Sequence, residues 1–172
     1  MNCSFTLQHY KECIELAKDK GYSIIPVKDY DKQKKVILLR HDIDLSLEYA
    51  YEFANIEYDL GICSSYYVYL HSPTYNALSP KSMGMINQMS QMGHEIGWHG
   101  EGTNYLQDED KILSQITGEG VKTWTFHLPG LTKELSIGLD NPNDLKLKYI
   151  YDISIVFLWL IKNWKLRSMD VY

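Results

Sequence analysis

The stretch Val36-Ile37-Leu38-Leu39-Arg40-His41-Asp42-Ile43-Asp44 is the part of the chain that best predicts its fold. Its first four residues are apolar, and this short run predicts a buried strand. Side chains alternate between the faces of a strand, so we expect Asp42 and Asp44 on one face and His41 on the other. Two neighbouring carboxylates repel each other unless a cation lies between them. The pair favours a metal site or acid–base chemistry, and the alternative is a strand-to-helix turn with Asp44 or Ser46 as N-cap.

Composition indicates an ordinary globular protein. The 172 residues are enough for one domain with a core, and we expect a single domain over 1–172. Hydrophobic residues make up 45% of the chain and charged residues 23%. The net charge of -5 argues against a nucleic-acid-binding surface, because such surfaces are basic.

The cysteines and the chain's apolar runs bear on location. Cys3, Cys13 and Cys63 are an odd number without a Cys-x-x-Cys spacing, which favours a reducing compartment. The first residues have neither the basic region nor the apolar stretch of a signal peptide. The apolar run at 153–161 is far shorter than the roughly 20 residues that span a bilayer. We therefore expect a cytoplasmic protein without a membrane span.

Strand and helix patterns alternate along the chain, which predicts an α/β fold. Strand–helix–strand connections of this length join parallel strands through right-handed crossovers. In the second helix, residues Leu47, Ala50, Ala54 and Tyr58 share the expected core face. The expected helices are 7–18, 46–59, 79–92 and 107–117, and the expected strands are 36–41, 65–71, 94–99 and 121–127.

The expected strands all end in polar residues. The carboxyl ends of parallel strands meet at one edge of a sheet, where α/β proteins place their sites. Three ends carry a histidine, namely His71, His99 and His127. Imidazoles that converge with a carboxylate are typical of a catalytic metal site with one position open for water. His94 lies at the opposite end of its strand from His99, so we expect a structural role for it.

Four segments carry a resemblance to a known family. The chain resembles the polysaccharide deacetylases, or NodB-homology group, of carbohydrate esterase family 4, in particular a bacterial branch associated with surface-polysaccharide biosynthesis. The resemblance covers roughly residues 22–130, and the string Gly-His-Glu-Ile-Gly-Trp-His is its most specific part. The segments are Leu39 to Asp44, Ser65 to Val68 with Ser72 to Asn76, Gly93 to His99, and Thr125 to Pro129.

The resemblance implies a fold and a reaction. The implied fold is an irregular (β/α) barrel of the NodB type. The implied reaction is metal-dependent hydrolysis of an acetyl group from an N- or O-acetylated sugar. Asp42 matches the catalytic base, Asp44 the metal-binding aspartate and His99 the first metal histidine. The implied metal is divalent, usually Zn²⁺.

The chain departs from the family pattern at three places. Thr103 stands where the family has a second metal histidine. His127 stands where the family often has an arginine that orients the base, so it either supplies the missing ligand or hydrogen-bonds to Asp42. The late Leu-x-His motif, which carries the catalytic acid, has no match after Gly130. Candidate substrate-binding residues are Arg40, His71, Tyr75 and Glu101.

Three functions remain open at this point. The first is a deacetylase that acts on an N-acetylated sugar of a surface-polysaccharide precursor. The second is an inactive remnant of that fold or a sugar-binding module, which the missing histidines favour. The third is a hydrolase of another non-peptide carbon–nitrogen bond. Residues 149–172 do not resemble the end of a barrel, which predicts either a truncated or frame-shifted terminus or a last element that covers the sheet.

Overall fold

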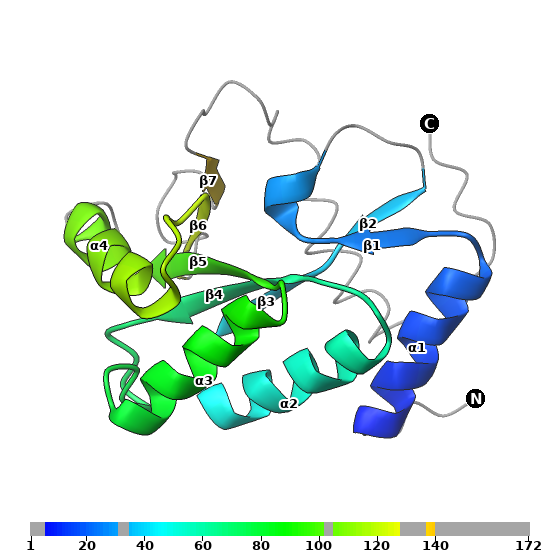
Figure 1. Ribbon diagram of the computed structural model, residues 1–172, viewed down its shortest axis with the longest axis horizontal. Helices are drawn as coiled ribbons and strands as arrows, with labels where there is room; N and C mark the ends of the chain where they lie inside the picture. Colours follow the sequence, from blue (N-terminus) through cyan, green and yellow to red (C-terminus); the bar gives the residue numbers. More distant parts are fainter. Residues whose placement is uncertain (1–5, 31–34, 102–104, 128–136, 140–172) are drawn as a thin grey trace.

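The computed structural model describes residues 6–30, 35–101, 105–127 and 137–139, and Figure 1 shows their arrangement. Helices alternate with strands, as the sequence predicts. The helices are α1 (Leu7–Asp19), α2 (Leu47–Asp59), α3 (Pro80–Gln91) and α4 (Leu106–Thr117), with a 3₁₀ turn η1 (Val27–Asp29). The strands are β1 (Ser23–Ile25), β2 (Val36–Leu38), β3 (Arg40–Ile43), β4 (Ser65–Tyr69), β5 (Glu95–Gly100), β6 (Thr123–Phe126) and β7 (Ile137–Leu139).

The strands form two sheets. β1 and β2 are a parallel pair, and the larger sheet has the order β3-β4-β5-β6-β7. Its first four strands are parallel, and β7 runs antiparallel to β6. The α/β class and the parallel strands are therefore confirmed. Within the described residues the five-stranded sheet is open, so the barrel remains a prediction.

The strand predicted at 36–41 is two strands, because the chain passes from one sheet to the other at Leu39. The Leu39 amide donates to the carbonyl of Ile25 at 3.2 Å, and the Leu39 carbonyl accepts from the amide of Ser65 at 2.9 Å. One residue thus hydrogen-bonds to both sheets. The Asp42 and Asp44 segment follows directly on this junction.

Local signals start the helices where the sequence predicts. Ser46 is the N-cap of α2, and its hydroxyl accepts from the amide of Tyr49. Ser79 caps α3 in the same way, with Pro80 in the first turn. α2 thus begins four residues after the end of β3, whereas α3 begins after a longer loop that follows β4.

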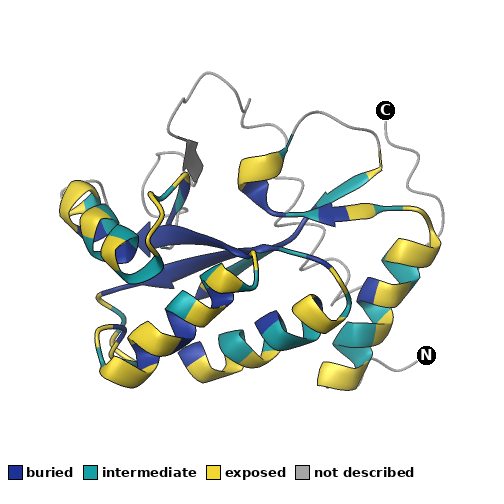
Figure 2. Ribbon diagram, viewed as in Figure 1, coloured by how far each residue is buried: buried dark blue, intermediate teal, exposed yellow. Residues whose placement is uncertain are grey.

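The main core lies between the larger sheet and helices α2, α3 and α4, which cover one of its faces (Figure 1). In Figure 2 strands β4 and β5 of the sheet are dark blue and the outer sides of the helices are yellow. Large buried side chains on this face include Tyr66, Val68 and Trp98. A smaller cluster of Ile14, Ile24, Leu39 and Ile62 packs α1 against the two-stranded sheet.

The core face of α2 differs from its prediction at one position. Tyr58 is 56% exposed, whereas Glu57 is completely buried. The two Glu57 carboxylate oxygens accept hydrogen bonds from four side chains, so the buried charge is fully satisfied. The donors are Tyr10 and His41 to Oε1, and Ser64 and Tyr66 to Oε2. Glu57, these four donors and His94 are called the Glu57 network below.

The opposite face of the sheet is polar. Glu95 accepts from the hydroxyls of Ser65 at 2.5 Å and Thr123 at 2.6 Å, and Thr123 contacts the Tyr67 hydroxyl at 2.7 Å. The Tyr67 ring lies against Gly97, where a Cβ atom would collide with it. Glycine is required at position 97 because that ring occupies the space of a side chain.

The structure bears in different ways on the predicted lack of a membrane span and on the predicted C-terminal block. No helix in the described part of the chain is both long enough and apolar enough to cross a bilayer. The predicted terminal block at 149–172 lies outside the described residues.

Candidate functional site

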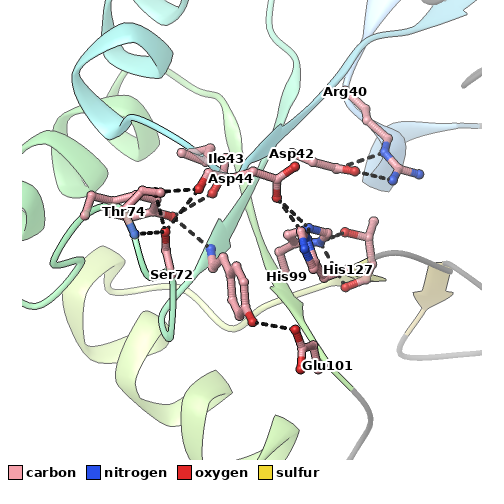
Figure 3. Close-up of polar contacts among 12 residues, drawn as sticks. Arg40, Asp42, Ile43, Asp44, Ser72, Thr74, His99, Glu101 and His127 are labelled. Carbon is pink, nitrogen blue, oxygen red and sulfur yellow. Dashed lines mark hydrogen bonds and ion pairs between the residues drawn. The ribbon is translucent and has the colours of Figure 1, made fainter. Parts of the chain in front are cut away.

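One carboxylate and two imidazoles meet at the carboxyl ends of the parallel strands (Figure 3). The Oδ1 atom of Asp44 lies 3.0 Å from Nε2 of His99 and 3.2 Å from Nδ1 of His127. The two imidazole nitrogens lie 3.3 Å apart. These three residues are called the Asp44 cluster. It contains the three residues predicted as metal ligands.

The strand register brings these three side chains together. His99 on β5 pairs with Thr125 on β6, and His127 follows two positions later on the same face. The His127 amide donates to the carbonyl of Gly100 at 2.7 Å, which keeps this residue beside β5. Asp44 lies one residue beyond β3, where the chain turns, so strand alternation accounts for the face of Asp42 but does not by itself account for the position of Asp44.

His99 is oriented by Thr125. Its Nδ1 atom lies 2.6 Å from the Thr125 hydroxyl and 3.2 Å from the Thr125 carbonyl oxygen. A carbonyl oxygen can only accept, so this contact favours the tautomer that carries its proton on Nδ1. Burial lowers the pKa of His99, which favours the neutral ring. The lone pair of Nε2 then faces the Asp44 carboxylate.

This arrangement suits a divalent metal ion. Tetrahedral zinc with ligands at about 2.0–2.1 Å separates its ligand atoms by roughly 3.3 Å. The three distances within the Asp44 cluster are 3.0, 3.2 and 3.3 Å. Aspartate and histidine are ordinary zinc ligands, and a hydrogen bond from the second imidazole nitrogen to the protein is typical of them. The cluster could therefore hold a metal and leave a fourth position open.

Asp42 lies beside the cluster and is paired with Arg40 (Figure 3). The guanidinium binds both carboxylate oxygens, with Nε to Oδ1 at 3.0 Å and Nη2 to Oδ2 at 2.5 Å. Arg40 also lies 5.6 Å from the centre of the Tyr67 ring, a cation–π distance. This two-point pair fixes the direction of the Asp42 carboxylate.

Glu101 lies on the other side of the cluster and is connected to it through Tyr69. The Tyr69 hydroxyl donates to Oε1 of Glu101 at 3.1 Å. The Tyr69 ring stacks on His127, with centroids 5.2 Å apart, and meets His99 edge-on at 5.7 Å. Because Glu101 is exposed, its carboxylate can meet a ligand at the mouth of the site.

The other two predicted substrate-binding residues point elsewhere. His71 pairs with the buried Glu109 of α4 at 3.3 Å and meets Tyr105 edge-on, so it lies on the helix side of the sheet. The Tyr75 hydroxyl donates to the carbonyl of Ile43 at 2.8 Å and accepts from the amide of Tyr69 at 3.1 Å. Tyr75 therefore connects two strand ends.

Sequence reasoning missed several residues that support the site. Thr125 orients His99, Tyr69 packs on both histidines, and Ser72 and Thr74 hydrogen-bond to the Asp44 carbonyl. Thr125 lies two residues before His127, so strand alternation was the available signal for Thr125. Thr103, the residue at the missing second histidine, lies outside the described residues.

No family model matches this sequence, and comparison with curated proteins and with solved structures also found no match. The functional argument therefore rests on the geometry of the site and on the sequence motifs.

Proposed function

We propose that the protein is a metal-dependent hydrolase that removes the acetyl group from an N-acetylated sugar of a surface-polysaccharide precursor. The convergence of Asp44, His99 and His127 at the carboxyl ends of the sheet is the observation that carries this proposal. The motifs that resemble polysaccharide deacetylases supply the reaction class. The fold that this proposal implies is the irregular barrel of the NodB type.

The Asp44 cluster would hold the metal through one oxygen and two nitrogens, a donor set that suits zinc. When bound, such an ion polarises a carbonyl group and makes a water molecule a better nucleophile. His99 presents Nε2 because Thr125 holds its other nitrogen. His127 takes the ligand role left open by Thr103, since its Nδ1 atom faces Asp44.

Asp42 acts as the general base in this proposal. Its carboxylate accepts the proton of the attacking water as that water adds to the acetyl carbonyl carbon. The C–N bond then breaks, the leaving nitrogen takes that proton, and acetate and the free amino sugar are released. Arg40 holds both oxygens of the carboxylate, and this keeps the base aimed beside the cluster. Glu101, held by Tyr69, binds sugar hydroxyl groups at the exposed side.

Zinc binding is the first test. We expect the purified, metal-free protein to bind one equivalent of zinc, and Asp44→Asn and His99→Ala to lose that binding. Asp108→Asn and His9→Ala are matched controls on α4 and α1, and both should bind like the parent. A well-folded parent without specific zinc binding would contradict the proposal.

Acetate release from N-acetylated sugars by the zinc-loaded protein is the second test. Asp42→Asn should retain zinc and lose turnover, because it removes the base and leaves the three ligands in place. Zinc binding without turnover on any acetylated sugar would favour the inactive sugar-binding module instead. Release of another amine product would favour a hydrolase of a different carbon–nitrogen bond.

A further inference from the structure

Three hydroxyl groups from one loop converge on two successive backbone carbonyls at the site. Figure 3 shows Ser72 and Thr74 beside Asp44. The Thr74 hydroxyl donates to the Asp44 carbonyl at 2.7 Å, and the Ser72 hydroxyl approaches the same oxygen at 3.1 Å. The Tyr75 hydroxyl donates to the carbonyl of Ile43 at 2.8 Å. All three donors come from residues 72–75, called the 72–75 loop, which follows β4.

The 72–75 loop is itself held in place by hydrogen bonds. The Thr74 amide donates to the Ser72 hydroxyl at 3.2 Å, a local turn, and the Ser72 amide donates to the Tyr69 carbonyl at 3.2 Å. Tyr75 accepts from the Tyr69 amide while it donates to Ile43. Burial raises the pKa of Tyr75, so its hydroxyl keeps the proton that it donates. The loop therefore ties the end of β4 to the end of β3.

Asp44 has little else to hold its backbone. It lies one residue beyond β3, and its amide makes only a tight turn to the Asp42 carbonyl at 3.2 Å. Leu45 is 75% exposed, so the next side chain contributes little packing. The Asp44 side chain is itself 42% exposed. A carboxylate on such a segment would sample several directions unless the adjacent carbonyl is fixed.

We propose that Ser72, Thr74 and Tyr75 are positioning residues that aim the Asp44 carboxylate at His99 and His127 before a metal ion binds. The inference rests on the proposed function, since it gives these hydroxyls a role through a metal ligand. Outer groups that orient a ligand typically change metal affinity by about 10–100-fold. The 72–75 loop thus sets metal affinity although none of its side chains is a ligand in this proposal.

Thr74→Val tests the inference because valine keeps the shape of threonine and removes the donor. We expect zinc to bind about tenfold more weakly, measured by competition with a chromophoric chelator. Thr74→Ser should restore the parent affinity, since serine keeps the hydroxyl. Thr117→Val is the matched control, because Thr117 donates to the Leu113 carbonyl at 3.0 Å within α4. Tyr75→Phe removes the donor to the Ile43 carbonyl and should also weaken zinc binding. Tyr51→Phe is its control, since the Tyr51 hydroxyl donates to Gln88.

Two further readouts separate positioning from stability. The absorption spectrum of bound Co²⁺ should change in Thr74→Val and not in Thr117→Val, since only the first alters ligand geometry. In the metal-free protein, the ¹⁵N resonance of Leu45, which shares a peptide unit with the Asp44 carbonyl, should also move in Thr74→Val alone. A merely structural hydroxyl would lower stability and leave the zinc affinity unchanged.

The outcomes distinguish this inference from the proposed function. Zinc binding by the parent with unchanged affinity in Thr74→Val overturns the positioning role and leaves the function intact. A parent that binds no zinc overturns the function. In that case an unmoved Leu45 resonance in Thr74→Val also overturns the orientation of Asp44 by the loop, because that measurement needs no metal.

Discussion

The Asp44 cluster and the Glu57 network each contain one carboxylate and two histidines, but their surroundings are opposite. Glu57 receives four hydrogen bonds and is completely buried on the helix side of the sheet. Asp44 meets two imidazole nitrogens at the strand ends and keeps a side chain 42% exposed. Residue type therefore does not separate a structural group from a candidate site, whereas hydrogen-bond saturation and access do.

The protons in the two groups also differ. In the Glu57 network the Ser64 amide donates to Nδ1 of His94, and Nε2 of His94 donates to the Ala54 carbonyl at 3.1 Å. Every buried polar side-chain atom among the described residues has a partner. In the Asp44 cluster a carboxylate oxygen and two imidazole nitrogens lie 3.0 to 3.3 Å apart, and a cation would satisfy all three atoms together. The first group should thus govern stability and the second metal binding.

Glu57→Gln should have the largest effect on folding. The substitution removes the charge and points amide hydrogens at hydroxyl donors, so we expect the free energy of unfolding to fall by about 3 kcal/mol. Urea unfolding of the metal-free protein measures it. Glu52→Gln on the exposed side of α2 is the matched control and should change stability by less than about 0.5 kcal/mol. An equal loss in both variants would contradict the structural role of Glu57.

Acid should weaken the Glu57 network specifically. Burial alone would raise the pKa of Glu57, but the neighbouring His41 and the hydrogen bonds from His41, Ser64 and Tyr10 lower it from 4.5 to about 2. The folded-state pKa is depressed, so the stabilisation is present above pH 4.5 and is lost as the pH falls towards 2. The shift corresponds to about 3 kcal/mol.

Urea midpoints between pH 6 and pH 2.5 measure this loss. Glu57→Gln should show a much flatter profile over the same window, because it lacks the titrating group. A parent profile as flat as that of the variant would show that the carboxylate is not stabilised by folding.

Tyr10→Phe should have a smaller effect. It removes one donor to Oε1 of Glu57 and leaves His41 on the same oxygen, so we expect a loss of about 1 kcal/mol. Tyr51→Phe removes a hydroxyl at the surface, which donates to Gln88, and should have almost no effect. A Tyr10→Phe protein as stable as Tyr51→Phe would show that α1 is not anchored through this contact.

Asp44→Asn should change the stability of the metal-free protein least, by less than about 0.5 kcal/mol, because the Asp44 side chain is 42% exposed and asparagine keeps its size and a polar end. In the presence of zinc, by contrast, the parent and the variant should differ strongly in stability. At a concentration 100 times its dissociation constant, zinc should stabilise the parent by about 2.7 kcal/mol and the variant not at all. Equal stabilisation of both proteins would place the metal elsewhere.

Sequence patterns predicted the features that depend on neighbours in the chain. The helix starts at Ser46 and Ser79 follow from capping chemistry, and the parallel order follows from strand–helix alternation. The preference for His99 over His94 follows from strand direction, and the structure brings His99 to the cluster while His94 lies in the Glu57 network.

The missed features depend on partners that are distant in the chain. Tyr58 was predicted on the core face of α2 and Glu57 was not, because the donors that bury Glu57 come from α1, β3 and the start of β4. The sequence left two roles open for His127, and only the folded register shows that its Nδ1 atom faces Asp44. The strand break at Leu39 was hidden because an unbroken apolar run gives no sign of a change of sheet.

The junction at Leu39 has a consequence for how the length of this chain can vary. The Leu39 amide hydrogen-bonds to the two-stranded sheet and its carbonyl to the five-stranded sheet, so these two bonds fix the position of the residue. Loss or gain of a single residue between Leu39 and Asp44 would exchange the two faces of β3. The Asp42 side chain would then lie on the helix-covered face of the sheet, and the His41 side chain on the opposite, polar face. An insertion or deletion in this segment should therefore preserve the site only if it adds or removes an even number of residues.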